Sequence, residues 1–177
     1  DMDKGAARLA DAVEAGTPVG VFGDYDVDGA AAAGLLVNVL GALGLAVDVH
    51  IPDRMREGYG PNEAALSALQ ERGAGLIVTV DCGIAAHRPL EKVAQTGMDV
   101  IVVDHHLAGP ELPRTHSVIN PNRLDEDGAY GHLCAAGVVF ILLVALIREL
   151  RRRGAFEGGR QAPDLMRQLD LVGLATV

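Results

Sequence analysis

Short apolar runs alternate with amphipathic stretches along most of the chain. The runs that have the length of strands are residues 18–22, 46–51, 76–80, 100–103 and 118–119. The stretches with helical spacing of apolar side chains are residues 3–16, 30–43, 63–72 and 85–96. Strands that alternate with helices are typical of βαβ units. We therefore predict an α/β fold with a mostly parallel, doubly wound sheet flanked by helices.

The C-terminal third begins with an uncharged segment at residues 133–147. A membrane span needs roughly 20 apolar residues, so this shorter segment predicts a buried core helix and no membrane association. Four arginines follow it: Arg148, Arg151, Arg152 and Arg153. Cations suit the C-terminal end of a helix, and contact with phosphate is the alternative interpretation. Residues 154–163 have the composition of a linker, and a last helix is predicted from Pro163.

Composition and charge narrow the class of protein. The 177 residues fit one domain with a sizeable core, and the 49 % hydrophobic content excludes a disordered chain. Two cysteines do not form a disulfide framework, and no secretory signal is evident, so we expect a cytoplasmic protein. The net charge of −9 disfavours a surface built for nonspecific nucleic-acid binding. It remains compatible with a nucleic-acid enzyme whose carboxylates hold metal ions.

The segment DYDVDG places three carboxylates, Asp24, Asp26 and Asp28, directly after the first predicted strand. Its spelling matches the first half of an EF-hand calcium loop. An EF-hand would have a glutamate at the twelfth position of the loop, where this chain has Leu35, and it would follow a helix. The carboxylates therefore belong to another kind of site.

Two further polar clusters also follow predicted strands. Asp81 comes after the run LIVTV, and Asp104, His105 and His106 come after VIVV. The carboxyl ends of parallel strands meet at one edge of a sheet, where α/β proteins bind their ligands. Several carboxylates that converge there need cations to remain ionised, and oxygen ligands with imidazole suit Mn²⁺ or Mg²⁺. A two-metal phosphoester hydrolase is the resulting prediction, with simple helix capping by these aspartates as the alternative.

Several motifs resemble a known family. VFGDYDVDG, VTVDCGI and VVDHH are similar, in this order, to the first three motifs of the DHH phosphoesterase superfamily. PDRMREGYG, INPN, LCAAGV and LDLVGLATV resemble in particular its RecJ-like single-stranded-DNA exonucleases. The resemblance implies a DHH catalytic domain over residues 1–177, taken from a longer protein that also has DHH-associated and OB-type domains. It implies 5′-to-3′ exonuclease activity in DNA repair and recombination, with single-stranded DNA and a single-strand-binding protein or helicase as partners.

The resemblance also implies roles for individual residues. The metal ligands would be Asp26, Asp28, Asp81, His105 and Asp170, with Asp81 bridging two Mn²⁺ or Mg²⁺ ions. His106 would contact the scissile phosphate, and Asp104 would orient the histidine pair. Tyr59, Gly60, Asn120 and Asn122 would shape the substrate path. Many superfamily members have a histidine where this chain has Phe22, so Asp24 is either a replacement ligand or a bystander.

Other functions remain open at this point. The same chemistry serves short oligonucleotides, cyclic dinucleotides or pyrophosphate as substrates. A noncatalytic nucleotide- or protein-binding relative is a second alternative, but such proteins commonly lose the metal ligands that this chain keeps. A dinucleotide-binding module is disfavoured because no G-x-G-x-x-G segment follows any predicted strand. Cys82 lies beside Asp81, and we interpret it as a small buried residue rather than a nucleophile.

Overall fold

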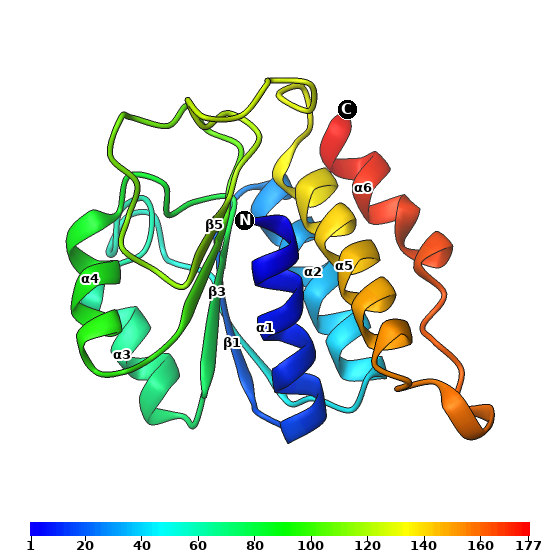
Figure 1. Ribbon diagram of the computed structural model, residues 1–177. Coiled ribbons are helices and arrows are strands. Elements are labelled where there is room, and N and C mark those ends of the chain that lie inside the picture. Colours follow the sequence, from blue (N-terminus) through cyan, green and yellow to red (C-terminus); the bar gives the residue numbers. More distant parts are fainter.

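The computed structural model describes residues 1–177, and its centre is one sheet of five parallel strands. The strands are β1 (Val19–Gly23), β2 (Val47–His50), β3 (Leu76–Val80), β4 (Val100–Val103) and β5 (Ser117–Ile119). Their order in the sheet is β2-β1-β3-β4-β5. Because every strand runs in the same direction, the loops that follow all five strands lie along one edge (Figure 1).

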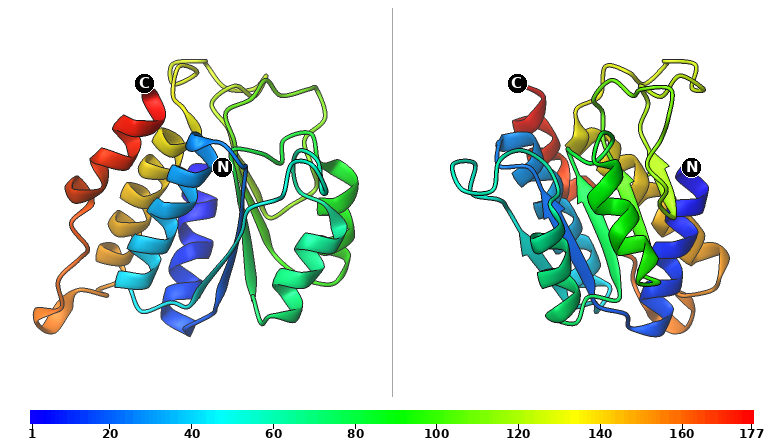
Figure 2. Two further views of the ribbon diagram at one scale, coloured as in Figure 1. Left: turned by 180° about the vertical axis from the view of Figure 1, so that it is seen from behind. Right: turned by 90° about the vertical axis from the view of Figure 1, so that its left-hand side faces the viewer.

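Helices cover both faces of the sheet (Figures 1 and 2). The helices on one side are α1 (Met2–Ala15), α2 (Val27–Ala42), α5 (Ala135–Arg152) and α6 (Leu169–Thr176). The helices on the other side are α3 (Glu63–Glu71) and α4 (His87–Gln95). Helix α6 packs on α2 and α5 and forms an outer layer away from the strands. The predicted doubly wound α/β fold is confirmed.

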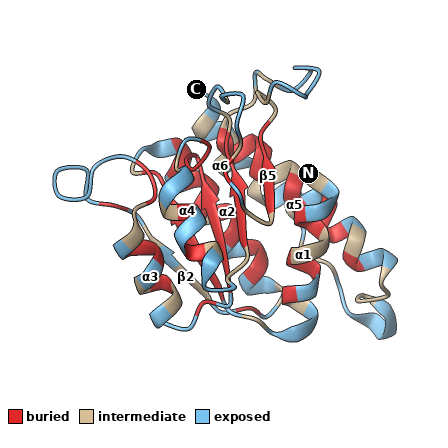
Figure 3. Cartoon of the chain, turned by 60° about the vertical axis from the view of Figure 1, so that its left-hand side comes forward, coloured by how far each residue is buried: buried red, intermediate tan, exposed pale blue.

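The sheet separates two hydrophobic cores. Strands β1, β3 and β4 are buried along their whole length, and Figure 3 shows them as the buried centre of the molecule. The larger core lies between the sheet and α1, α2 and α5, and the smaller one lies under α3 and α4. Alternate residues of β1 serve the two cores: Val21 belongs to the larger and Phe22 to the smaller. Strands that are buried on both faces explain the continuous apolar runs in the sequence.

Two helices differ from their predicted bounds for identifiable reasons. Helix α2 begins at Val27, three residues before the predicted start, because the Asp26 side chain caps it. Helix α5 continues to Arg152, beyond the uncharged segment. Its charged end is held by Arg153, which pairs with Glu149 and with acidic side chains of α1. These pairs disfavour contact between Arg153 and phosphate, since its guanidinium is already occupied by carboxylates.

The segment after α5 contains short helical turns. A 3₁₀ turn at Glu157–Gly159 lies inside the predicted linker, and a second at Leu165–Gln168 leads into α6. The helix expected from Pro163 therefore starts as a 3₁₀ turn and becomes α-helical at Leu169. None of the helices combines the length and the apolar character that crossing a bilayer requires.

Candidate metal centre

The loop after β1 carries the first three carboxylates. The Asp26 carboxylate accepts hydrogen bonds from the backbone amides of Asp28 and Gly29, at 2.9 and 3.0 Å, and so caps α2. Asp24 is buried, and its Oδ1 atom has no hydrogen-bond partner. The tight turn requires glycine at position 29, because a Cβ atom there would lie 2.5 Å from the backbone oxygen of Asp24. The loop thus holds a buried, unpaired carboxylate oxygen close to an exposed carboxylate.

Asp28 is fixed by the N-terminus of α5. Its two carboxylate oxygens accept hydrogen bonds from the backbone amides of Ala135 and Ala136, at 2.7 and 2.8 Å. These amides are among those that a helix leaves without an internal partner, and the positive end of the helix dipole favours the carboxylate there. The Oδ2 atom of Asp28 also lies 3.6 Å from Nε2 of His105. Each oxygen keeps a second lone pair, so the capping role does not prevent Asp28 from binding a cation.

Asp81 follows β3 and is the most enclosed carboxylate that faces this cluster. Only 2 % of its surface is exposed, and its backbone φ of 60° lies in the left-handed region. Its Oδ1 atom lies 3.2 Å from Nε2 of His105 but has no hydrogen-bond partner in favourable geometry. Burial, with the nearby carboxylates of Asp28 and Asp26, raises the pKa of Asp81 to about 6. Burial also raises the pKa of Asp24, and the interaction with Asp81 raises that of His105.

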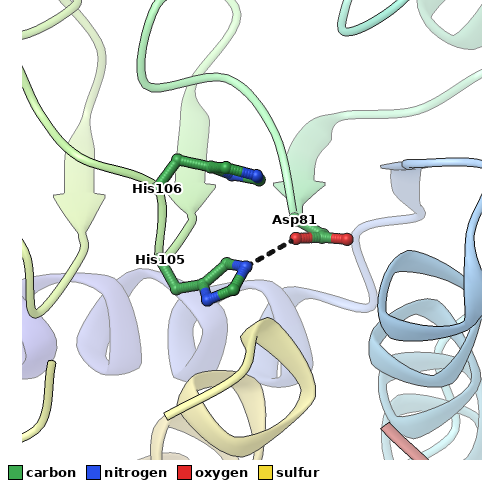
Figure 4. Close-up of side chains that lie close together, drawn as sticks. All are labelled: Asp81, His105 and His106. Atoms are coloured by element: carbon green, nitrogen blue, oxygen red, sulfur yellow. Dashed lines mark ion pairs between the residues drawn. The ribbon is translucent and has the colours of Figure 1, made fainter. Parts of the chain in front are cut away.

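Asp104 organises the histidine pair after β4. It is fully buried, and its Oδ1 atom accepts hydrogen bonds from the backbone amides of His105 and His106, at 2.7 and 3.1 Å. The same atom lies 2.7 Å from Nδ1 of His106, while Oδ2 accepts from the amide of Ile84 at 2.9 Å. Figure 4 shows the rings of His105 and His106 projecting toward Asp81. These contacts fit the predicted orienting role of Asp104.

The side chains of Asn120 and Asn122 hold the main chain of the histidine pair, His105 and His106. The Asn120 side-chain amide donates to the backbone oxygen of His106 at 2.9 Å, and that of Asn122 donates to the oxygen of His105 at 2.5 Å. Asn120 Oδ1 in turn accepts from the backbone amide of Asn122 at 2.7 Å. The structure therefore gives both residues a role in fixing the main chain of the histidine pair, and their place in the substrate path stays a prediction. Sequence reasoning missed this role, since nothing local links the INPN segment to the histidines.

Tyr59 and Gly60 lie where the sequence places them, beside the cluster. The Tyr59 hydroxyl donates to the backbone oxygen of Asp81 at 3.4 Å, and its ring meets that of His106 edge-on with centroids 6.2 Å apart. The loop that carries Tyr59 is tied to the sheet by His50, whose Nε2 atom lies 2.8 Å from Glu57. Tyr59 is 58 % exposed, so much of its surface remains accessible beside the histidine pair.

Two predicted or expected ligand positions lie outside the cluster. Asp170 is exposed in the first turn of α6, where its carboxylate accepts from the backbone amide of Leu171 at 2.9 Å. It belongs to neither group of potential metal ligands, so the structure does not bring it to the other carboxylates. Phe22 is fully buried in the smaller core and stacks on the ring of His50 with centroids 5.3 Å apart. An aromatic packing residue thus occupies the position where many superfamily members have a histidine.

Five of the remaining side chains fall into two groups, and within each group the ligand atoms lie within 4.8 Å of one another; Asp28 is in neither group but lies 3.6 Å from His105 Nε2. One group is Asp24, Asp26 and Asp81, and the other is Asp81, His105 and His106. The unpaired buried oxygens of Asp24 and Asp81 have the character of cation ligands, because a buried carboxylate oxygen without a partner is costly. The donor set of carboxylates and imidazole fits Mn²⁺ or Mg²⁺. Fold and site together define an α/β domain with a divalent-metal centre at the carboxyl edge of its sheet.

Comparison with known proteins places this domain in a family. Residues 18–175 match the model of the DHH family, N-terminal domain, and the chain belongs to the DHH family. It is 40 % identical over 178 residues to the single-stranded-DNA-specific exonuclease RecJ of Escherichia coli, and 40 % identical over 149 residues to RecJ of Bacillus subtilis. A crystal structure of exonuclease RecJ bound to manganese superimposes with a TM-score of 0.83 and 35 % identity.

The matches cover nearly all of this chain but only part of each relative. They cover 99 % of this chain for the Escherichia coli relative and for the manganese-bound structure, and 84 % for the Bacillus subtilis relative. The chain spans only 31 % and 19 % of the two curated relatives and 42 % of the chain in the crystal structure. The similarity supports a metal-dependent DHH phosphoesterase domain. Because the chain spans less than half of each relative, these matches do not extend to the activity of a whole RecJ protein.

Proposed function

We propose that this domain is the catalytic part of a 5′-to-3′ exonuclease that hydrolyses single-stranded DNA with two Mn²⁺ or Mg²⁺ ions. The observation that carries the proposal is the place of Asp81. This carboxylate belongs to both groups of potential ligands, and its Oδ1 atom is buried without a hydrogen bond. One carboxylate shared by two groups of potential ligands is an arrangement that suits a pair of cations. The similarity to RecJ exonucleases supports single-stranded DNA as the substrate.

The ligands would divide around Asp81. Asp24 and Asp26 would hold one ion, and His105 with Asp28 would hold the other, with Asp81 shared. Bound there, two divalent cations supply an acidified water and offset the negative charge of the phosphate. The amides at the N-terminus of α5 keep the Asp28 carboxylate in a fixed orientation toward His105. The protein thus provides preorganised ligands, which is the main requirement for phosphoryl transfer.

His106 is the side chain placed to contact the phosphate directly. Its Nδ1 atom is held 2.7 Å from Asp104, which leaves Nε2 to donate a hydrogen bond to a phosphoryl oxygen. The ring is 47 % exposed, whereas the carboxyl group of Asp104 is fully buried. Asp104, Asn120 and Asn122 fix the main chain and the ring, so the donor is in position before substrate binds.

The test uses the intact protein and single-stranded oligonucleotides labelled at either end, with Mn²⁺ or Mg²⁺. We expect stepwise release of nucleotides from the 5′ end, and a loss of about a thousandfold or more in Asp81→Asn, because an amide cannot serve as a shared anionic ligand. Asp164→Asn, at an exposed turn before α6, is the matched control and should keep full activity. Unchanged activity in Asp81→Asn would contradict the two-metal assignment. Cleavage of very short strands only would redirect the proposal to oligonucleotide hydrolysis.

A further inference from the structure

The loop between β2 and α3, residues 51–62, projects from the body of the molecule beside the metal centre (Figure 2, right). We call it the Tyr59 loop. Seven successive residues, 53–59, are exposed, and only Pro52, Gly60 and Pro61 are buried. Burial therefore contributes little to the shape of this loop, and its polar contacts largely define it.

The carboxylate of Glu57 collects three of these contacts at the base of the Tyr59 loop. Its Oε1 atom accepts a hydrogen bond from the backbone amide of Asp53 at 2.9 Å. Its Oε2 atom lies 2.8 Å from Nε2 of His50 and accepts from the side-chain amide of Asn62 at 3.4 Å. His50 is the last residue of β2, and Asn62 is the N-cap of α3. One carboxylate thus joins the two ends of the loop.

His50 gives Glu57 a fixed donor. The hydrogen bond from the Asp53 amide, and then that from His50, holds the pKa of Glu57 below its ordinary value. An ionised carboxylate only accepts hydrogen bonds, so Nε2 of His50 carries the hydrogen and donates it. The His50 ring also stacks on the fully buried ring of Phe22, with centroids 5.3 Å apart. The contact therefore ties the exposed loop to the smaller core.

The orientation of Tyr59 depends on this closure. Tyr59 comes two residues after Glu57, and it contacts the backbone oxygen of Asp81 and the ring of His106. Its neighbours Gly58 and Gly60 have φ angles of 82° and 79°, in the left-handed region that favours glycine. Glycine permits the sharp turn on each side of Tyr59 but does not restrict the backbone to it. Contacts elsewhere in the loop must therefore hold the tyrosine in place.

We propose that Glu57 is a positioning residue, whose carboxylate closes the Tyr59 loop on β2 and α3 and so holds Tyr59 against Asp81 and His106. Glu57 belongs to neither group of potential metal ligands. The inference rests on the proposed hydrolysis of single-stranded DNA, and it assigns the upkeep of one side of that site to a residue outside it.

The first measurement follows the loop itself, by limited trypsin digestion of the intact protein under native conditions. Arg54 and Arg56 are exposed cleavage sites within the Tyr59 loop. Because proteolysis of a folded chain requires local opening, we expect Glu57→Ala to raise the rate of cleavage after these arginines about fivefold or more. Fragment masses identify the cleaved bonds.

The second measurement is hydrolysis of a single-stranded oligonucleotide by the same proteins with Mn²⁺. Glu57→Ala should lower kcat/KM about tenfold, because Tyr59 is no longer held in one orientation. In a protein that already carries Tyr59→Ala, it should have little further effect. Glu57→Gln should retain more activity than Glu57→Ala, since its carbonyl oxygen still accepts from the amide of Asp53.

Two further variants make the comparison specific. His50→Phe keeps an aromatic ring for Phe22 but loses the donor to Glu57, so it should change both measurements in the same direction as Glu57→Ala and by less. Glu63→Ala is the matched control, because it removes a nearby carboxylate that pairs with Lys92 of α4 and not with the Tyr59 loop. It should behave like the unsubstituted protein.

The outcomes separate this proposal from the proposed function. Unchanged trypsin cleavage in Glu57→Ala would overturn the closing role of Glu57. An equal loss of kcat/KM with and without the Tyr59 ring would show that Glu57 does not act through Tyr59, and the exonuclease proposal would stand. If the unsubstituted protein hydrolyses no strand while Glu57→Ala still opens the loop to trypsin, the proposed function fails and the closure of the loop by Glu57 stands.

Discussion

Asparagine in place of Asp81 should make the metal-free protein more stable at neutral pH while removing its response to metal. Asp81 is buried with an unpaired oxygen, and nearby carboxylates add to the cost of its charge. The amide of asparagine is nearly isosteric with the carboxyl group and carries no charge. Asparagine also tolerates the left-handed backbone at this position, where φ is 60°, better than alanine does. The substitution therefore isolates the charge from the shape and from backbone strain.

The magnitude follows from the pKa of Asp81. A pKa raised from 3.8 to about 6 means that the folded chain binds a proton more tightly than the unfolded chain does. The corresponding stability is present below about pH 4 and is lost as the pH rises through about 6, a difference of about 3 kcal/mol. A buried amide with incomplete hydrogen bonds returns about 1–2 kcal/mol of this gain. We expect a net gain of about 1–2 kcal/mol at pH 7.5, or roughly 2–8 °C in Tm.

Thermal unfolding of the intact protein with EDTA, between about pH 5 and pH 7.5, measures the effect. The unsubstituted protein should lose stability across this range, and the raised pKa of His105 contributes in the same direction. Asp81→Asn should show a shallower pH dependence. With Mn²⁺ in excess, the unsubstituted protein should gain stability by binding, whereas the variant should gain little. Asp164→Asn, an exposed change of the same kind, should follow the unsubstituted protein throughout.

Three results would refute the reasoning. If Asp81→Asn unfolds at a lower temperature than the unsubstituted protein in EDTA at pH 7.5, the charge of Asp81 is stabilising in the metal-free fold. If the two proteins share the same pH dependence of stability, the carboxyl group of Asp81 does not titrate near pH 6. Equal stabilisation of both by Mn²⁺ would show that the ion binds elsewhere.

Three further changes test other parts of the fold. Gly29→Ala should lower the free energy of unfolding in urea by about 2–3 kcal/mol, because its Cβ would lie 2.5 Å from the backbone oxygen of Asp24. Gly41→Ala in the same helix meets nothing within 4 Å and should raise it by about 0.5–1 kcal/mol. Equal effects of the two substitutions would contradict the close packing at Gly29. Asn120→Ala, which loses its bond to the backbone of His106, should lower kcat about tenfold with little change in KM, and a change in KM alone would favour substrate contact. Arg153→Ala should lower stability by about 1 kcal/mol through its pairs with α1, an effect that should shrink at high salt.

Much of the fold could be predicted because strands and helices are encoded by local patterns. Apolar runs and helical spacing each extend over a few residues, so they identify the five strands and predict a parallel sheet. The position of a polar residue directly after a strand is also local, which is why Asp81 and the histidine pair are found without coordinates. The helix boundaries were less accurate. The start of α2 and the end of α5 depend on capping and ion pairs with other segments.

The precise roles within the site depended on tertiary contacts. Asp28 caps a helix that begins more than a hundred residues later, and Asn120 and Asn122 hold the main chain of the histidine pair. No sequence pattern encodes such contacts, because they arise only when crossover helices bring distant strand ends together. Asp170 shows the converse. A motif predicted it to be a ligand, and this stays a prediction, because helix α6 exposes Asp170 and the structure does not group it with the other carboxylates.

The sequence by itself therefore determined which strand ends carry charge, since the order of apolar and acidic residues along each strand is a local property. The tertiary structure decided which of those charges meet and which are already used by backbone amides. The physical reason is the distance along the chain over which each effect acts. Periodicity acts over a few residues, whereas burial and the pKa of Asp81 depend on everything that packs around that carboxylate.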